Sequence, residues 1–233
     1  MNMKNHRFTA TALLLTLALF LGAAPPARAQ MKDALLVEHA ATVFDEIMGA
    51  PDKGIPQAIL DKAEAIAVFP GMLRAGFIFG GQRGHGIISA RDRANHTWSA
   101  PAFLTITGGS WGAQIGGQAV DLVLIVMNAR GVDNLLKNQF KVGGEASAAA
   151  GPVGRSTEAS TDVLMRAEIL SYSRSRGLFA GIAINGSSVH ADVDANERLY
   201  GKRLTSREIA IEHRGGSPTP IASWLETLRK YCR

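Results

Sequence analysis

Apolar residues follow two different spacings along the chain. Between residues 31 and 48 they recur every three or four positions, which predicts an amphipathic helix. From residue 65 to 191 this pattern gives way to short apolar and β-branched runs broken by glycine, such as AGFIFGG and VDLVLIVM. Such runs favour strongly curved antiparallel strands over long helices. Helical spacing appears at residues 129–138 and returns at 194–213 and 221–228.

This order of elements predicts an α+β fold. We expect a curved antiparallel β-sheet that closes toward a barrel or sandwich, with packed helices at both ends of the chain. The composition, 46% hydrophobic over 233 residues, supplies enough apolar side chains for one sizeable core. We therefore expect one main domain over residues 30–213, followed by a linker and a C-terminal helix over residues 214–233.

The first 29 residues have the composition of a secretory signal peptide. Lys4 and Arg7 precede the apolar run TATALLLTLALFLGAA, and the small-residue sequence ARA ends at Ala29. We expect cleavage before Gln30, which would place the protein in the periplasm or outside the cell, with peripheral membrane association as a possibility. The alternative is an uncleaved membrane anchor, which the short apolar run and its two following prolines disfavour.

Charge and cysteine content limit the classes of function. The formal charge of +5 falls to +2 when Lys4, Arg7 and Arg28 leave with the signal peptide, so the sequence does not predict a nucleic-acid partner. Cys232 is the only cysteine, which excludes an intramolecular disulfide and leaves its own role open. The histidines show no metal-site spacing, and we expect neither a metal nor a cofactor.

Two glycine-rich stretches resemble catalytic or phosphate-binding motifs. GGQRGHG, at residues 80–86, is followed by IISA, which predicts a strand where a phosphate-binding loop needs a helix. We interpret it as a hairpin with Arg83 near its tip. GGSWG satisfies the G-x-S-x-G pattern around Ser110, with Asp192 or Asp194 and His213 as candidate partners. A glycine-rich, strand-like segment follows it, so we expect Ser110 to be structural, with a serine hydrolase as an alternative.

A longer series of motifs resembles the SYLF lipid-binding domain family, which includes a yeast actin-patch domain. The resemblance covers residues 55–200, and its most specific strings are AAAGPVGR and YSRSRGLFAG. It implies a non-enzymatic module that binds membrane surfaces and recognises acidic phospholipid headgroups, including phosphoinositides. Because an exported chain would not meet actin, we do not expect actin to be a partner. The alternative is a structural envelope protein that binds protein or peptidoglycan.

Basic residues inside these motifs are the candidate headgroup ligands. Arg174 and Arg176 alternate along a predicted strand, so both should lie on one face together with Tyr172. Further candidates, which depend on how the chain folds, are Arg155, Arg83 and Arg91. The alternative for all five arginines is a solvated or salt-bridged rim. The helix predicted at residues 31–48 carries four acids against Lys32, so we expect it to pack on the sheet.

Overall fold

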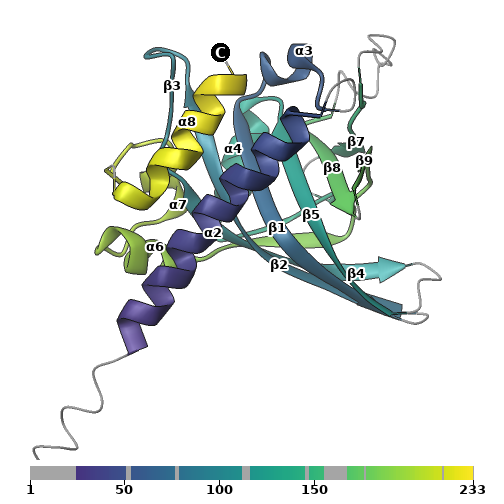
Figure 1. Cartoon of the computed structure of the whole chain (residues 1–233), viewed down its shortest axis with the longest axis horizontal. Helices are drawn as coiled ribbons and strands as arrows, with labels where there is room; N and C mark the ends of the chain where they lie inside the picture. The colour runs from purple at the N-terminus through teal and green to yellow at the C-terminus, as the bar shows by residue number, and fades with distance from the viewer. Residues whose placement is uncertain are drawn as a thin grey trace, which may run out of the picture.

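Most of the chain folds around one large, curled sheet (Figure 1). The computed structural model describes residues 25–50, 54–76, 79–111, 116–144, 147–154, 167–175, 177–216 and 218–232. Most of the expected signal peptide, residues 1–24, lies outside the described residues. The first described helix, α2 (Pro25–Met48), begins six residues before the predicted one, so the expected cleavage point before Gln30 falls in its second turn.

The sheet is a half-barrel with helices from both ends of the chain packed on it, which confirms the predicted fold class. Its strands follow the order β6-β10-β4-β2-β1-β5-β8-β7, with β3 paired to β2 and β9 to β8. One pair departs from the expected antiparallel arrangement, because β7 and β8 are parallel. The strands are β1 (Ala65–Gly76), β2 (Phe79–Asp92), β3 (Thr97–Trp98), β4 (Ala102–Trp111), β5 (Gly116–Val126), β6 (Gln139–Lys141), β7 (Ala148–Ala150), β8 (Ile169–Ser175), β9 (Leu178–Gly181) and β10 (Ser187–Ala191).

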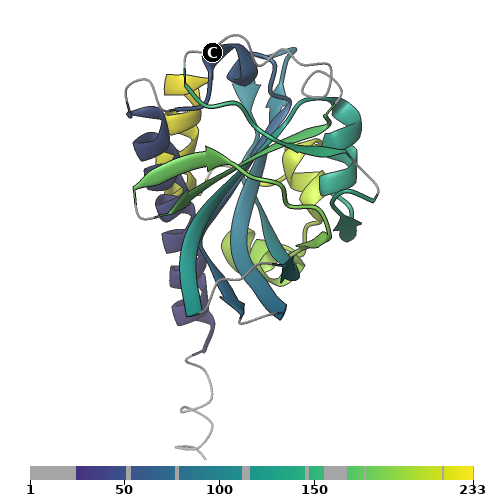
Figure 2. The same cartoon turned by 90° about the vertical axis from the view of Figure 1, so that its right-hand side faces the viewer.

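Both faces of the sheet are covered by helices, and each face has its own core (Figure 2). Neighbouring residues such as Ile87 and Ile88 are fully buried on opposite faces, because side chains alternate along a strand. Helices α2 and α8 (Ala222–Tyr231) cover what we call the α2 face. Helices α4 (Ala129–Leu135) and α7 (Ser206–Ala210) cover the α4 face. This double burial explains why the strands are continuous apolar runs.

The stretch GGQRGHG lies within strand β2, which pairs antiparallel with β1, so it is one arm of a strand pair and the expected turn within it is wrong. The strand runs through Phe79–Asp92, and residues 77–78 before it lie outside the described part. Close packing explains two of the glycines. A Cβ at Gly84 would lie 2.9 Å from Cβ of Met72, and a Cβ at Gly86 would lie 2.4 Å from Cδ1 of Phe69.

Helix α2 packs on the sheet, as the sequence predicts, and it also packs on α8. Lys230 donates a hydrogen bond to Oδ1 of Asp45 at 2.7 Å, and the Tyr231 hydroxyl donates to the same oxygen at 2.9 Å. The rings of Phe44 and Trp224 meet edge to face, with centroids 6.0 Å apart. Within the described part of the chain, no helix is both long and apolar enough to cross a membrane.

The shorter helices complete the two layers. Helix α6 (Val193–Tyr200) begins with Asp192, whose carboxylate accepts a hydrogen bond from the Ala195 amide, and it ends at Gly201 with φ 67°. Glycine suits that left-handed position because it carries no Cβ. Helix α7 begins with a capping box formed by Thr205 and Glu208. The remaining short helices are α3 (Gln57–Leu60) and the 3-10 turn η2 (Thr219–Ile221).

Candidate functional site

Arg174 and Tyr172 lie on one face of β8, but that face is the α2 face, which α2 covers. Arg174 donates to Oδ2 of Asp121 from Nε at 3.0 Å and from Nη2 at 2.8 Å, and it also pairs with Glu46 of α2. Tyr172 is fully buried, stacks on Phe179 at 5.4 Å, and has its pKa raised by burial. Arg174 therefore joins the sheet to α2, which corresponds to the salt-bridged alternative.

The other candidate arginines do not converge on one point. Arg83 and Arg91 both lie on β2, eight residues apart. At roughly 3.3 Å per residue this spacing puts them about 26 Å from each other, too far for one headgroup phosphate. Arg83 is exposed at the end of the strand that lies away from the helices, opposite Leu73 of β1. Arg155 and Arg176 lie outside the described residues.

Ser110 does not occupy a nucleophile elbow. It lies in β4, where its backbone pairs with Gly80, and the next described element is the strand β5. A nucleophile elbow requires a sharp turn from a strand into a helix. The candidate partners are also engaged elsewhere, because His213 pairs with Asp92 at 3.4 Å and Asp192 caps α6. This backbone geometry argues against the serine hydrolase alternative.

A cationic pocket lies at the other end of β2, between the turn that joins β2 to β3 and the end of α8. Its volume is about 340 Å³. Figure 1 shows β3, the end of α8 and the C terminus together at one end of the molecule. Three arginines, a histidine, a threonine, a tryptophan and a cysteine line it, and we call it the arginine pocket. The lining residues are Arg91, Arg93, His96, Thr97, Trp98, Arg229 and Cys232.

Arg91 is the least exposed of the three arginines that line the arginine pocket, and it is firmly positioned. Its Nε donates to the carbonyl of Ala63 at 3.0 Å and its Nη2 to that of Leu60 at 2.9 Å, while its Cζ lies 4.8 Å from the centroid of the Trp98 ring. Burial, and to a smaller extent the charge of Arg93, lower the pKa of the Arg91 guanidinium. An incoming anion would offset both effects.

Arg93 and Arg229 form the accessible walls of the pocket and come from different elements. The side chain of Arg93 is 51% exposed and pairs with Glu64 at 2.8 Å. Arg229 is exposed on the last turn of α8, and in the part of the chain that the structure describes it has no ion-pair partner. Trp98 of β3 joins the two elements, because its indole Nε1 donates to the carbonyl of Cys232 at the end of α8, at 3.3 Å. The walls thus present two reachable cations to one ligand.

Three acids of α2 form ion pairs, which changes the expected electrostatics of this helix. Asp33 accepts from Nε of Arg198 at 2.6 Å, Asp45 pairs with Lys230, and Glu46 pairs with Arg174. Each of these three carboxylates is matched by a cation from the sheet, α6 or α8, which partly neutralises the negative charge of the helix.

Of the sequence candidates that the structure describes, only Arg91 lies in the arginine pocket, and Arg93 and Arg229 were missed. The spacing of Arg91 and Arg93 in ARDRANH was a usable signal, because alternate residues leave a strand on the same side. Arg229 gave no such signal, because basic residues are common in the last turn of a helix. It lies 136 residues further along the chain than Arg93, and only the packing of α8 on β3 brings the two together.

Comparisons with known proteins identify the family. The family model described as "Ysc84: Las17-binding protein actin regulator" matches residues 107–231, more than half of the chain. Protein YSC84 of Saccharomyces cerevisiae is 34% identical over 185 residues, 78% of this chain. SH3 domain-containing YSC84-like protein 1 is 33% identical over 180 residues in Homo sapiens and 37% identical over 153 residues in Xenopus laevis, 76% and 65% of this chain.

The chain belongs to the Ysc84 (SYLF) family, which confirms the family resemblance seen in the motifs. The names of these relatives describe binding or an SH3 domain, and none of them names a catalytic activity. The matches span only 39% of the yeast protein, 45% of the Xenopus protein and 51% of the human protein. This chain therefore corresponds to about half or less of each of these relatives.

Proposed function

We propose that this protein is a non-enzymatic binding protein of the cell envelope that recognises acidic phospholipid headgroups on a membrane surface. The observation that carries the proposal is the arginine pocket, where Arg93 and Arg229 flank a firmly positioned Arg91. Guanidinium groups bind phosphate oxygens through paired hydrogen bonds, and their planar shape favours such contacts over those of lysine. A volume of about 340 Å³ suits a polar headgroup.

The position of the pocket supports a surface role. Its lining residues come from the end of β2, from β3 and from the end of α8, and β3 and the end of α8 lie beside the C terminus at one end of the molecule (Figure 1). Each basic residue near an anionic bilayer contributes on the order of 1 kcal/mol, so the reachable arginines would give moderate, reversible binding. Attraction of this kind is weakened by salt, because the Debye length falls to about 3 Å at 1 M.

The proposed location is the periplasm or the cell exterior, reached through the signal peptide in residues 1–29 and cleavage before Gln30. We do not extend to an exported protein the Las17 binding and actin regulation named in the description of the family model. The Ser110 hydrolase has no comparable support, because the backbone around that serine continues from one strand to another.

The test is co-sedimentation with vesicles of phosphatidylcholine, with or without phosphatidylglycerol. The parent protein should sediment with the acidic vesicles and not with the neutral ones. The double variant Arg93→Gln with Arg229→Gln should lose roughly tenfold or more in affinity, because two cations at about 1 kcal/mol each are removed. Its circular dichroism should match that of the parent, since both side chains are exposed.

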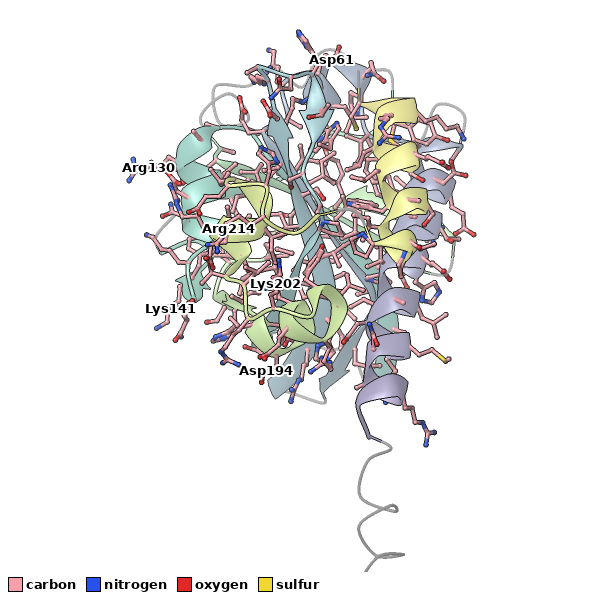
Figure 3. All side chains as sticks on the ribbon, turned by 90° about the vertical axis from the view of Figure 1, so that its left-hand side faces the viewer. Asp61, Arg130, Lys141, Asp194, Lys202 and Arg214 are labelled. Atoms are coloured by element: carbon pink, nitrogen blue, oxygen red, sulfur yellow. The ribbon has the colours of Figure 1, made fainter. Side chains whose placement is uncertain are left out.

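A matched control removes two arginines elsewhere. Arg130 and Arg207 are exposed, by 78% and 53%, and each forms an ion pair with one acid, as Arg93 does with Glu64. Figure 3 shows Arg130 on the side of the molecule away from α2 and α8. The variant Arg130→Gln with Arg207→Gln should bind like the parent. Equal losses in both double variants would show that only overall charge matters, and absence of parent binding would favour a structural envelope role.

A further inference from the structure

Arg74 is a half-buried cation on the α4 face, and no carboxylate pairs with it among the residues that the structure describes. It lies on β1, far from the arginine pocket and toward the end of the sheet that the helices leave uncovered. Its Nε donates to Oε1 of Gln82 at 3.0 Å. Burial lowers the pKa of its guanidinium. A guanidinium withdrawn from water with one neutral partner is unfavourable for the isolated protein.

Polar side chains from neighbouring strands are arranged around Arg74 in a row. Gln82 of β2, which accepts from Arg74, also donates from Nε2 to Oγ of Ser187 at 2.7 Å. On the other side, Gln118 of β5 lies directly opposite Arg74 and donates to Ser175 of β8. We call these residues the polar row; its members are Ser187, Gln82, Arg74, Gln118 and Ser175.

Gly108 shows that the polar row depends on close packing. It lies on β4 between Gln82 and Ser187, and a Cβ there would lie 3.0 Å from Oγ of Ser187 and 3.2 Å from Nε2 of Gln82. A side chain at this position would obstruct the hydrogen bond that crosses β4. Arg74 uses its Nε to donate to the Gln82 oxygen. Its two terminal nitrogens can still donate to another acceptor, and the described residues provide none.

We propose that Arg74 is the centre of a second ligand site, which takes an oxyanion group, either a carboxylate or a phosphate. The two terminal nitrogens of one guanidinium match the two oxygens of such a group, and the hydrogen bond to Gln82 fixes the orientation of the guanidinium plane. The side-chain amides of Gln82 and Gln118 flank it on either side, one on each neighbouring strand.

An apolar residue next to the polar row indicates that the ligand is an amphiphile. Leu178 of β9 is 78% exposed and lies opposite Ser175, so the two side chains are on the same face of the sheet. If the oxyanion of such a ligand is bound at Arg74, its alkyl chain would contact Leu178 at the β8 end of the polar row. A longer chain should therefore strengthen binding, whereas a bare anion would use only the polar contacts.

The experiment measures binding of acetate, inorganic phosphate and laurate by thermal shift and by the NMR signal of the Arg74 Nε–H group, with chloride at equal ionic strength as the reference. Acetate and phosphate should raise the melting temperature above that in chloride and move the Arg74 signal. Laurate should act at a concentration at least about tenfold lower than acetate. Equal effects of acetate and laurate would contradict the amphiphile, and an effect no larger than that of chloride would overturn the site.

The variant Arg74→Gln separates a ligand site from a structural contact. It should lose about tenfold or more in affinity for the anions, yet melt at the same or a higher temperature than the parent in chloride, because an unpaired cation is removed. The matched control Arg83→Gln removes an exposed arginine near the same end of the sheet but on the opposite face, and it should bind like the parent. A large fall in the melting temperature of Arg74→Gln would show that Arg74 is structural.

Discussion

Arg174 shows how a phosphate-binding residue and a structural residue can look the same in a sequence. Its fork is held by Asp121 and Glu46, and Asp121 also accepts a hydrogen bond from the amide of Gly71 at 2.9 Å. Gly71 lies in the β-bulge of β1 and has a φ of 57°. One carboxylate therefore supports both the bulge and the arginine, which in turn reaches the helix α2.

The variant Arg174→Gln should destabilise the protein. It leaves Asp121, whose side chain is only 19% exposed, without its cation. The cost should be about 1–2 kcal/mol, between the values for exposed and fully buried pairs. Chemical denaturation of parent and variant measures it. An unchanged midpoint together with lost vesicle binding would instead restore Arg174 as a headgroup ligand.

Two glycines near the uncovered end of the sheet are not required by packing against the residues that the structure describes. A Cβ on Gly81 or on Gly117 would meet nothing within 4 Å, and neither residue has a positive φ. Glycine costs a strand roughly 0.5–1 kcal/mol relative to alanine, because it loses more backbone entropy on folding. Gly81→Ala and Gly117→Ala should each raise the free energy of unfolding by about that amount.

Gly86→Ala is the matched control for these two variants. The new Cβ would lie 2.4 Å from the carbonyl oxygen of Val68 and from Cδ1 of Phe69, so this substitution should destabilise the protein by about 1–3 kcal/mol or more. Urea denaturation of the three variants measures the free energy of unfolding, and so tests both the expected increase and the expected decrease. Destabilisation by Gly81→Ala would mean that the backbone there needs glycine for a reason other than space.

At the scale of elements, one ion pair links the first and last helices of the described chain. The hydrogen bond from Lys230, followed by that from Tyr231, lowers the pKa of Asp45 in the folded protein below its ordinary value of 3.8. A carboxylate with a lowered pKa stabilises the fold at pH values above the ordinary one, and this contribution is lost as the pH falls through the lowered value. Neutral solution therefore favours the docking of α8 on α2.

The variant Asp45→Asn should reduce stability at pH 7, and the difference from the parent should shrink below about pH 4, where the parent carboxylate also becomes protonated. Thermal melting of both proteins across this range measures the difference. A difference that stays constant from neutral to acid would mean that the charge of Asp45 is not what holds α8. Glu38→Gln is a suitable control, because Glu38 is exposed and has no ion pair among the described residues.

Helix and strand positions were predictable from spacing, whereas the uses of the polar residues were not. Apolar runs such as VDLVLIVM identify a strand buried on both faces, and the described β5 includes all but its last residue. The parallel pairing of β7 and β8 and the position of GGQRGHG inside β2 depend on contacts between distant segments. The same is true of Arg229, and of Arg74, whose partner Gln82 is visible only once the register of β1 and β2 is known.

At the scale of the whole molecule, the half-barrel separates two cationic features. The arginine pocket lies where β2 ends and α8 finishes, and the polar row crosses the strands toward the uncovered end of the sheet. Three acids of α2, which are Asp33, Asp45 and Glu46, form ion pairs with cations of the fold.

The central claim is that the protein binds acidic membrane surfaces through electrostatic attraction. The most direct measurement is the affinity of the parent protein for phosphatidylglycerol-containing and pure phosphatidylcholine vesicles, each at low and at high salt. The account predicts binding to the acidic vesicles at low salt, a marked loss at high salt, and little binding to the neutral vesicles at either. Equal binding to both kinds of vesicle, or binding that salt does not change, would contradict it.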